Sequence, residues 1–172
     1  SEQFYDPQLR PWFMGAMALT EPGAVHWTAP YTFFTTGDPG ITASACTRLA
    51  DGRDFVLGFD LRLRELSQTT LQASVGQHGM ALVLTSDDRV LALPAAPDPG
   101  NTEEWLKKAL QPSTALGLPA LDAALQRWRA AGRPAGRVLS FEVQGTRWLV
   151  SVRPYALGEQ QFRVVGLAPA AD

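Results

Sequence analysis

Short apolar runs separated by turn residues constrain this chain more than any other feature of its sequence. In the first third, runs rich in aromatic and β-branched residues lie at 27–36, 41–49 and 55–63. The segments between them contain Gly37-Asp38-Pro39-Gly40 and Asp51-Gly52, which are typical of turns. Runs of this length and composition favour strands, so we predict an antiparallel meander.

A second meander is predicted at the end of the chain, with strands over 137–143, 147–154 and 161–168. Its last strand contains Val164-Val165-Gly166-Leu167, which is similar to Val56-Leu57-Gly58-Phe59 in the first meander. The shared phrase indicates two copies of one α+β unit with antiparallel sheets. The second copy also has a predicted hairpin over 79–94 and two predicted helices, one beginning at Asn101 or Thr102 and one after Pro119. The first copy lacks this opening hairpin and the helix that would lead into it.

The element order of the second copy resembles that of a PAS-like unit, in which helices cover one face of a five-stranded antiparallel sheet. We expect an incomplete first unit over 1–62 and a complete PAS-like unit over 76–172. Between them, Leu63, Leu66 and Leu71 have helical spacing, which predicts a linking helix over 63–75. A short helix is also expected after Pro11.

Composition excludes several classes of function. Fifteen basic and seventeen acidic residues give a net charge of −2, which argues against a nucleic-acid partner. The single cysteine, Cys46, excludes an intrachain disulfide framework and a cysteine-based zinc cluster. With only His26 and His78 and no local catalytic motif, we expect no enzymatic activity, no metal site and no cofactor.

No apolar run approaches the roughly 20 residues that span a bilayer. Because the chain starts at Ser1 in a loop-like sequence, we expect it to be a piece of a longer protein.

One segment carries most of the side chains that could bind a ligand. Tyr5-Asp6-Pro7-Gln8-Leu9-Arg10-Pro11-Trp12-Phe13 places aromatic rings and a cation on a loop stiffened by two prolines. The guanidinium of Arg10 offers a planar fork of donors that suits a carboxylate. Further along, Tyr31 offers a phenol and Asp60 an acceptor for an ammonium group. An alternative remains open, in which the aromatic rings are core residues and Arg10 forms an internal ion pair with Asp60.

The string Tyr-Asp-Pro-x-x-Arg-Pro-Trp-Phe at 5–13 is followed by Trp27-Thr28-x-Pro30-Tyr31, Gly40-Ile41-Thr42-Ala43-Ser44 and Gly58-Phe59-Asp60-Leu61. In order and spacing these motifs resemble Cache domains, in particular the double-Cache type. Such domains are extracytoplasmic sensor modules of bacterial chemoreceptors, histidine kinases, diguanylate cyclases and adenylate or guanylate cyclases. The resemblance implies two PAS-like Cache units, the first being membrane-distal and the second membrane-proximal.

The resemblance also implies a ligand site in the first unit. In family members that bind amino acids, the matching Arg and Trp hold the ligand carboxylate, while the Tyr of the first motif and the Asp of the last strand help to hold the ammonium. Here these contacts fall on Arg10, Trp12, Tyr5 and Asp60, with Tyr31 beside them.

Two residues of this predicted site depart from the amino-acid binders. Phe13 stands where those proteins have Tyr, and Phe33 stands where they have an acid. The loss of that acid predicts a less polar carboxylate than an α-amino acid, or no ligand in this pocket.

We therefore expect a periplasmic sensor of a membrane-tethered receptor that binds a small carboxylate and relays the signal to a cytoplasmic output domain. The alternative is a structural or dimerisation module of the same receptor type, without a ligand, in which Phe13 and Phe33 fill the cavity. In either case, a distal unit without its opening elements exposes strand edges, so a homodimer is a further expectation.

Overall fold

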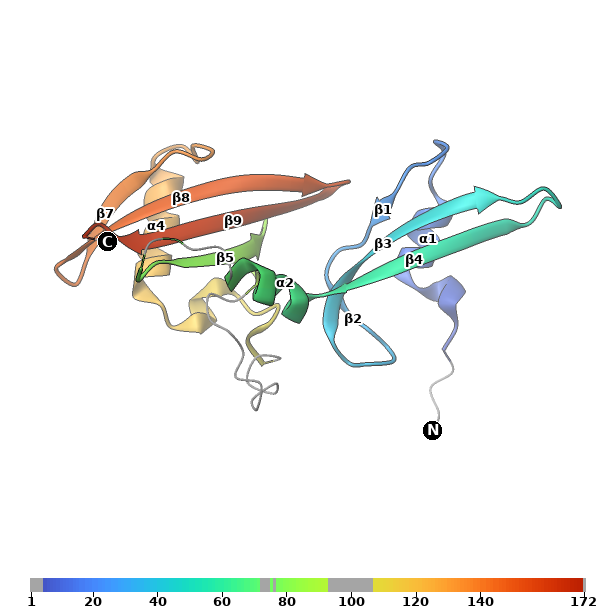
Figure 1. Cartoon of the computed structure of the whole chain (residues 1–172), viewed down its shortest axis with the longest axis horizontal. Coiled ribbons are helices and arrows are strands. Elements are labelled where there is room, and N and C mark those ends of the chain that lie inside the picture. Colours follow the sequence, from blue (N-terminus) through green and yellow to red (C-terminus); the bar gives the residue numbers. More distant parts are fainter. Residues whose placement is uncertain (1–4, 72–74, 76, 93–106, 172) are drawn as a thin grey trace. The chain divides into compact units, whose positions relative to one another are not determined.

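The computed structural model of the chain describes residues 5–71, 75, 77–92 and 107–171. Contacts within the chain divide it into two compact units (Figure 1). The first unit comprises Ser1–Arg62 and Leu157–Gln160, and the second comprises Leu63–Ala156 and Gln161–Asp172. A helix is predicted to begin at Asn101 or Thr102, and its part up to residue 106 lies outside the described residues.

The first unit begins with two short helical turns that prolines initiate. Its elements are the 3-10 turn η1 (Pro7–Leu9), helix α1 (Pro11–Met17) and strands β1 (His26–Trp27), β2 (Tyr31–Thr32), β3 (Pro39–Arg48) and β4 (Asp54–Arg62). The carboxylate of Asp6 caps η1 by accepting a hydrogen bond of 2.9 Å from the backbone N–H of Gln8. Pro11 then starts α1, where a missing backbone N–H costs nothing.

Strand β3 is the centre of the four-stranded sheet in the first unit. Strand β4 pairs with it in antiparallel register from Gly40↔Arg62 to Arg48↔Asp54. Strands β1 and β2 pair with β3 near Ala43 and Gly40 respectively, so they follow each other along its other edge. The single strand predicted over 27–36 is therefore wrong. Pro30 lies between the two short strands, and it has no N–H with which to continue the ladder.

The second unit contains a five-stranded sheet in the order β6-β5-β9-β8-β7. Its elements are α2 (Leu63–Leu71), β5 (Met80–Thr85), β6 (Val90–Ala92), the 3-10 turn η2 (Ser113–Leu116), α4 (Pro119–Ala130), β7 (Leu139–Val143), β8 (Thr146–Leu157) and β9 (Gln160–Pro169). The registers of β5 with β6, β5 with β9 and β7 with β8 are antiparallel. The predicted hairpin, helix α4 and final meander are therefore confirmed. The predicted linking helix over 63–75 is described as a helix as far as Leu71.

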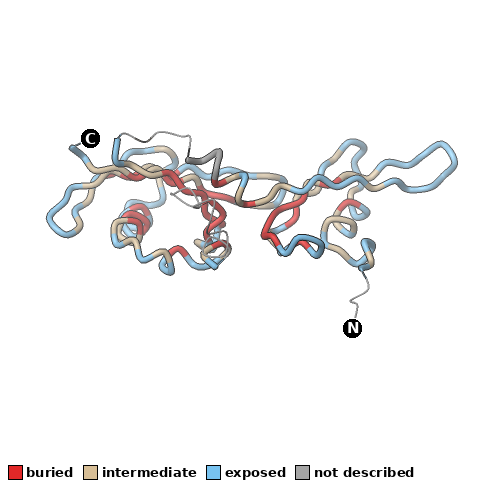
Figure 2. Tube along the Cα trace, turned by 60° about the horizontal axis from the view of Figure 1, so that its bottom comes forward, coloured by how far each residue is buried: buried red, intermediate tan, exposed pale blue. Residues whose placement is uncertain are grey.

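The apolar core of the second unit lies between its sheet and helix α4. Four α4 side chains at helical spacing are buried, namely Leu121, Ala124, Leu125 and Trp128. The sheet contributes fully buried residues from its central strands, including Leu82, Leu84, Val165 and Leu167. Figure 2 shows β5 as mainly buried and β9 as a mixture of buried and intermediate residues, whereas the far end of the β3–β4 hairpin in the first unit is exposed. Two antiparallel sheets with few helices confirm the predicted α+β class.

Candidate functional site

Helix α1 packs on one face of the sheet in the first unit. Two strand residues on that face, one polar and one small, accommodate the helix. The hydroxyl of Ser44 on β3 donates a hydrogen bond of 2.7 Å to the backbone carbonyl of Trp12. Directly across the ladder from Ser44 is Gly58 on β4. A Cβ at Gly58 would lie 3.1 Å from the Trp12 ring, so the absence of a side chain lets the helix approach closely.

The residue at the start of α1, Arg10, lies among three aromatic rings. Its guanidinium carbon is 5.8 Å from the ring centroid of Tyr5, 6.0 Å from that of Tyr31 and 5.9 Å from that of Phe34. Cations at such distances from aromatic faces are attracted by the ring quadrupole. Arg10 is half-buried and lines a hollow of about 120 Å³ together with Tyr5, Asp6, Leu9 and Phe34.

A chain of three polar side chains lies on the other side of Tyr31. The Tyr31 hydroxyl is 2.7 Å from the hydroxyl of Thr42, which donates a hydrogen bond of 2.6 Å to the Asp60 carboxylate. Thr42 and Asp60 are direct cross-strand partners on β3 and β4, which explains why their side chains meet. The ring of Tyr31 therefore lies next to the Arg10 guanidinium, and its hydroxyl is linked through Thr42 to the Asp60 carboxylate.

The electrostatics of Tyr31 reflect this position. Burial raises the pKa of its phenol above the usual value, because a phenolate loses hydration there. The Asp60 carboxylate also raises the Tyr31 pKa, whereas the Arg10 guanidinium lowers it. Arg10 and Asp60 are thus both close enough to act on the same phenol. No ion pair joins them within the described part of the chain, so the alternative of an internal Arg10–Asp60 pair is wrong.

The structure places the remaining predicted site residues in packing contacts. Phe33 is only 5 % exposed, and its ring lies edge-on to Tyr31 with centroids 5.2 Å apart. Trp12 and Phe13 form another edge-to-face pair at 5.6 Å. Of the seven residues predicted for the site, Arg10, Tyr5, Tyr31 and Asp60 lie together, while Trp12, Phe13 and Phe33 support the surrounding fold.

Two residues at this site were missed by sequence reasoning. Phe34 contacts Tyr5, with centroids 5.0 Å apart, and forms part of the hollow next to Arg10. Thr42 connects Tyr31 with Asp60. Phe34 could have been found from its place beside Phe33 in an aromatic run. Thr42 could have been found only from the β3–β4 register.

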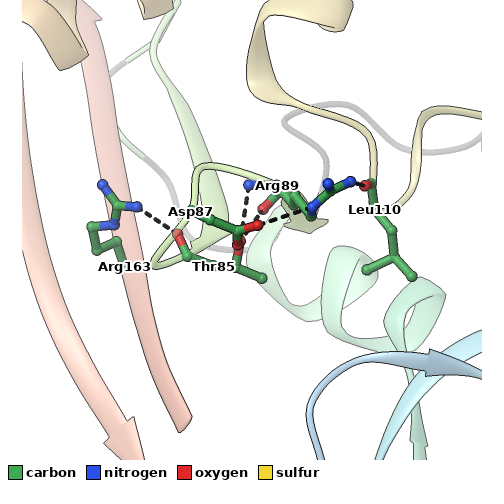
Figure 3. Close-up of polar contacts among 5 residues, drawn as sticks. All are labelled: Thr85, Asp87, Arg89, Leu110 and Arg163. Atoms are coloured by element: carbon green, nitrogen blue, oxygen red, sulfur yellow. Dashed lines mark hydrogen bonds and ion pairs between the residues drawn. The ribbon is translucent and has the colours of Figure 1, made fainter.

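The second unit has a polar cluster at the turn between β5 and β6 (Figure 3). The Asp87 carboxylate accepts hydrogen bonds of 2.5 Å from the hydroxyl of Thr85 and 2.9 Å from the guanidinium of Arg89. The hydrogen bond from Thr85 is the main reason why the pKa of Asp87 lies below its usual value. The buried Arg163 of β9 donates a hydrogen bond of 2.6 Å to the carbonyl of Thr85. These hydrogen bonds join residues of the β5–β6 turn to one another and attach the turn to strand β9 of the same sheet.

In the part of the chain that the structure describes, the remaining histidine and cysteine side chains form no further cluster with acidic residues. His26 and Cys46 lie on β1 and β3, and the Cys46 sulfur is 3.8 Å from that of Met17. Among the residues whose placement is described, no three His, Cys, Asp or Glu side chains are grouped as a metal site would require. Over the same residues, no helix is both long and apolar enough to cross a membrane.

No protein-family model matches the chain, but its sequence is similar to bacterial chemotaxis proteins and to a bacterial adenylate cyclase. The methyl-accepting chemotaxis protein McpA of Bacillus subtilis is 30 % identical over 109 residues, covering 62 % of this chain and 15 % of that protein. Adenylate cyclase 1 of Rhizobium meliloti is 26 % identical over 171 residues, covering 96 % of this chain and 24 % of that protein. The chain therefore spans a quarter or less of these relatives.

Solved structures similar to this chain are ligand-binding domains of chemoreceptors. The domain of the Pseudomonas fluorescens chemoreceptor CtaA, in complex with L-serine, matches with a TM-score of 0.60 and 22 % identity, covering 98 % of this chain and 63 % of that one. The domain of the Pseudomonas aeruginosa chemoreceptor PctC, in complex with GABA, matches with a TM-score of 0.59 and 21 % identity, covering 95 % and 62 %. The chain thus has the α+β, PAS-like fold of Cache-type sensor domains, as the sequence predicted.

Proposed function

We propose that this chain is the extracytoplasmic ligand-sensing module of a bacterial signal-transduction receptor, and that it binds a small carboxylate in the first unit. The observation that carries the proposal is the position of Arg10. Its guanidinium is held by a capped, proline-stiffened loop among three aromatic rings, at the wall of a hollow of about 120 Å³. The similarity to chemoreceptor ligand-binding domains supports the same function.

The arrangement around Arg10 suits a carboxylate for physical reasons. A guanidinium can donate two parallel hydrogen bonds to a carboxylate, and partial burial strengthens them relative to bulk water. The rings of Tyr5, Tyr31 and Phe34 provide an apolar wall for a short carbon chain. Tyr31 and Asp60 would serve the other end of the ligand.

Signalling and location form part of the same proposal. In a receptor tethered to the inner membrane, the module would lie in the periplasm and pass a ligand-induced change to a cytoplasmic output domain. A ligand shifts such an equilibrium only by the difference between its affinities for the two receptor states. The ligand must therefore contact groups that differ between these states.

Calorimetric titration of the chain with a panel of small carboxylates tests the proposed function. We expect Arg10→Ala to weaken binding by about tenfold to a hundredfold, since a hydrogen bond to a charged group contributes about 1.5–3 kcal/mol. Arg53→Ala is the matched control, because Arg53 lies in the exposed β3–β4 turn and pairs there with Asp51. Equal binding by wild type and Arg10→Ala would contradict a ligand role for Arg10.

A dimerisation module without a ligand is the second candidate function, and the exposed face of β4 favours it. Phe55, Leu57 and Phe59 alternate along β4 and are all exposed. Since Asp60 and Gly58 face α1, these three residues point to the opposite face of the sheet. The proposed partner is a second copy of this chain.

A further inference from the structure

We infer that the second unit binds a small neutral polyol in a hollow of its own. The hollow has a volume of about 240 Å³ and lies between helix α4, the segment that leads into η2 and the β5–β6 turn. This volume is below the roughly 300–1,000 Å³ of pockets that take drug-sized ligands, so a small molecule fits it. Among the described residues, its polar lining comes from Asp88, Ser113, Thr114, Asp122, Gln126 and Arg129, which all belong to the second unit.

The charged groups at this hollow largely neutralise one another. The Asp88 carboxylate forms ion pairs with Arg129 of α4 and, at 2.8 Å, with the buried Arg163 of β9. Asp122 in the first turn of α4 adds a second carboxylate, so two anions accompany two cations. A ligand carboxylate would have to displace Asp88 from its guanidinium partners. Because Arg163 is buried, that exchange is costly, whereas a neutral ligand does not require it.

A buried hydroxyl in the lining has no partner of its own. Ser113 is only 3 % exposed, and its backbone N–H donates a hydrogen bond of 2.8 Å to the carbonyl of Asp88. Its side-chain hydroxyl has no hydrogen-bond partner among the residues that the structure describes. Polar groups buried to this extent are nearly always hydrogen-bonded, and a group that enters the hollow can supply the partner. The half-buried carboxylate of Asp122 likewise has no partner in the described part of the chain.

The mixture of donors and acceptors in the lining favours hydroxyl groups on the ligand. The hydroxyls of Ser113 and Thr114 and the amide of Gln126 can both donate and accept, whereas the Asp122 carboxylate only accepts. An aliphatic hydroxyl also donates and accepts, so it can satisfy all of these groups. An ammonium only donates, so it suits Asp122 but cannot accept from the amide N–H groups of Gln126.

The same hollow has a surface that suits the carbon chain of a polyol. Pro112 and Leu125 complete its described lining with apolar side chains. Small-molecule sites commonly combine such apolar surface with a few polar groups that fix the orientation of the ligand. A short carbon chain that carries several hydroxyls matches both parts of the lining.

Calorimetric titration of the chain with glycerol, xylitol and mannitol tests the inference, with propylamine as the cationic alternative. We expect saturable binding of at least one polyol at one site per chain. Ser113→Ala should weaken it about threefold to tenfold, the equivalent of one hydrogen bond. Gln126→Trp should abolish it, because Gln126 is exposed on α4 and a larger ring there would fill the hollow. Ser140→Ala is the matched control, since Ser140 is an exposed serine of β7 outside the described lining.

The inference fails if none of the polyols binds in a saturable manner, or if propylamine binds more tightly than all of them. It also fails if Ser113→Ala and Gln126→Trp both keep the wild-type affinity, because the polyol would then bind elsewhere. Thermal unfolding checks the fold of each variant, and Gln126→Trp, a change at an exposed position, tests the site if Ser113→Ala does not fold.

Arg10→Ala separates this inference from the proposed carboxylate site. Arg10 belongs to the first unit, so polyol binding should be unchanged in a folded Arg10→Ala variant. A loss of polyol binding in that variant would assign the polyol to the first unit and overturn the inference. A chain that binds a polyol but no carboxylate would contradict the proposed function and support the second site.

Discussion

Two charged side chains act on the phenol of Tyr31 from different elements of the first unit. Arg10 precedes α1 and Asp60 belongs to β4, and each shifts the pKa of Tyr31 in its own direction. A phenol in this position reports on its neighbours without any ligand. It therefore offers a direct test of the residue arrangement on which the proposed site depends.

We expect Asp60→Asn to lower the pKa of Tyr31 and Arg10→Gln to raise it. The first substitution removes a negative charge that opposes ionisation, and the second removes a positive charge that favours it. Both shifts should be less than about one pKa unit, because water partly screens the two groups. Ultraviolet absorbance of the phenolate measures them once the signal of the same variant carrying Tyr31→Phe has been subtracted. Shifts in the same direction, or none, would contradict the arrangement.

At the scale of secondary-structure elements, the short strand β2 depends on a close contact between a glycine and an aromatic ring. Gly40 on β3 is the cross-strand partner of Tyr31, and Phe33 follows directly after β2. A Cβ at Gly40 would lie 2.1 Å from the Phe33 ring and 2.7 Å from the Leu61 carbonyl. Neither atom has room to give way, because Phe33 is buried and the carbonyl belongs to the backbone.

Gly40→Ala is therefore expected to destabilise the first unit by about 1–3 kcal/mol, the usual cost of overpacking a filled core. The matched control is Gly166→Ala, a strand glycine in the second unit whose added Cβ would have no neighbour closer than 3.8 Å. Chemical denaturation followed by fluorescence compares the two variants. Equal stability of both variants would show that the contact of Gly40 with Phe33 is unimportant.

The hairpin of β3 and β4 shows how far sequence reasoning reaches. Both strands are evident from their apolar residues, and Asp51-Gly52 correctly marks the turn between them. A two-residue Asp-Gly loop, however, would place Thr42 opposite Leu61. The actual connection is five residues long, from 49 to 53, and the register places Thr42 opposite Asp60. A shift of one residue moves every side chain to the other face, so the contact of Thr42 with Asp60 could not be predicted from the turn signal.

The resemblance to Cache motifs predicted the proximity of side chains better than the turn signal did. The motif string grouped Arg10, Tyr31 and Asp60 across about 50 residues of sequence, and the structure brings Arg10 and Asp60 close to the phenol of Tyr31. Composition alone could not do this, because aromatic clusters usually belong to cores. The same string also included Trp12 and Phe33, whose rings support the helix and β2. A motif thus identifies the neighbourhood of the proposed site, whereas the contacts of each of its members depend on packing.

At the scale of the whole molecule, the two units differ in how they bury apolar surface. The second unit covers its sheet with α4, whereas the first leaves one face of β4 open to solvent, with Phe59 69 % exposed. Within the described residues, β4 pairs only with β3, so its outer edge is also unpaired. An exposed apolar edge strand of nine residues is a template for pairing with another chain.

The sequence of β4 is suited to pairing with a second copy of itself. Antiparallel pairing centred on Gly58 would place Asp54 opposite Arg62 of the copy, so that opposite charges meet at both ends. In the same register, Phe55 faces Leu61 and Leu57 faces Phe59. All four apolar residues then lie on one face of the joined sheet, which would bury surface that the single chain exposes.

We expect Phe59→Asp to abolish self-association of the chain, because it places a charge at the centre of the paired apolar face and next to Leu57 of the copy. Val138→Asp is the matched control, since Val138 is an apolar residue of the second unit that is 60 % exposed and does not belong to β4. Sedimentation velocity over a range of concentrations should show a reversible dimer for wild type and for Val138→Asp, and a monomer for Phe59→Asp. A wild-type chain that stays monomeric, or a Phe59→Asp variant that still dimerises, would remove β4 as the interface and with it the support for the dimerisation function.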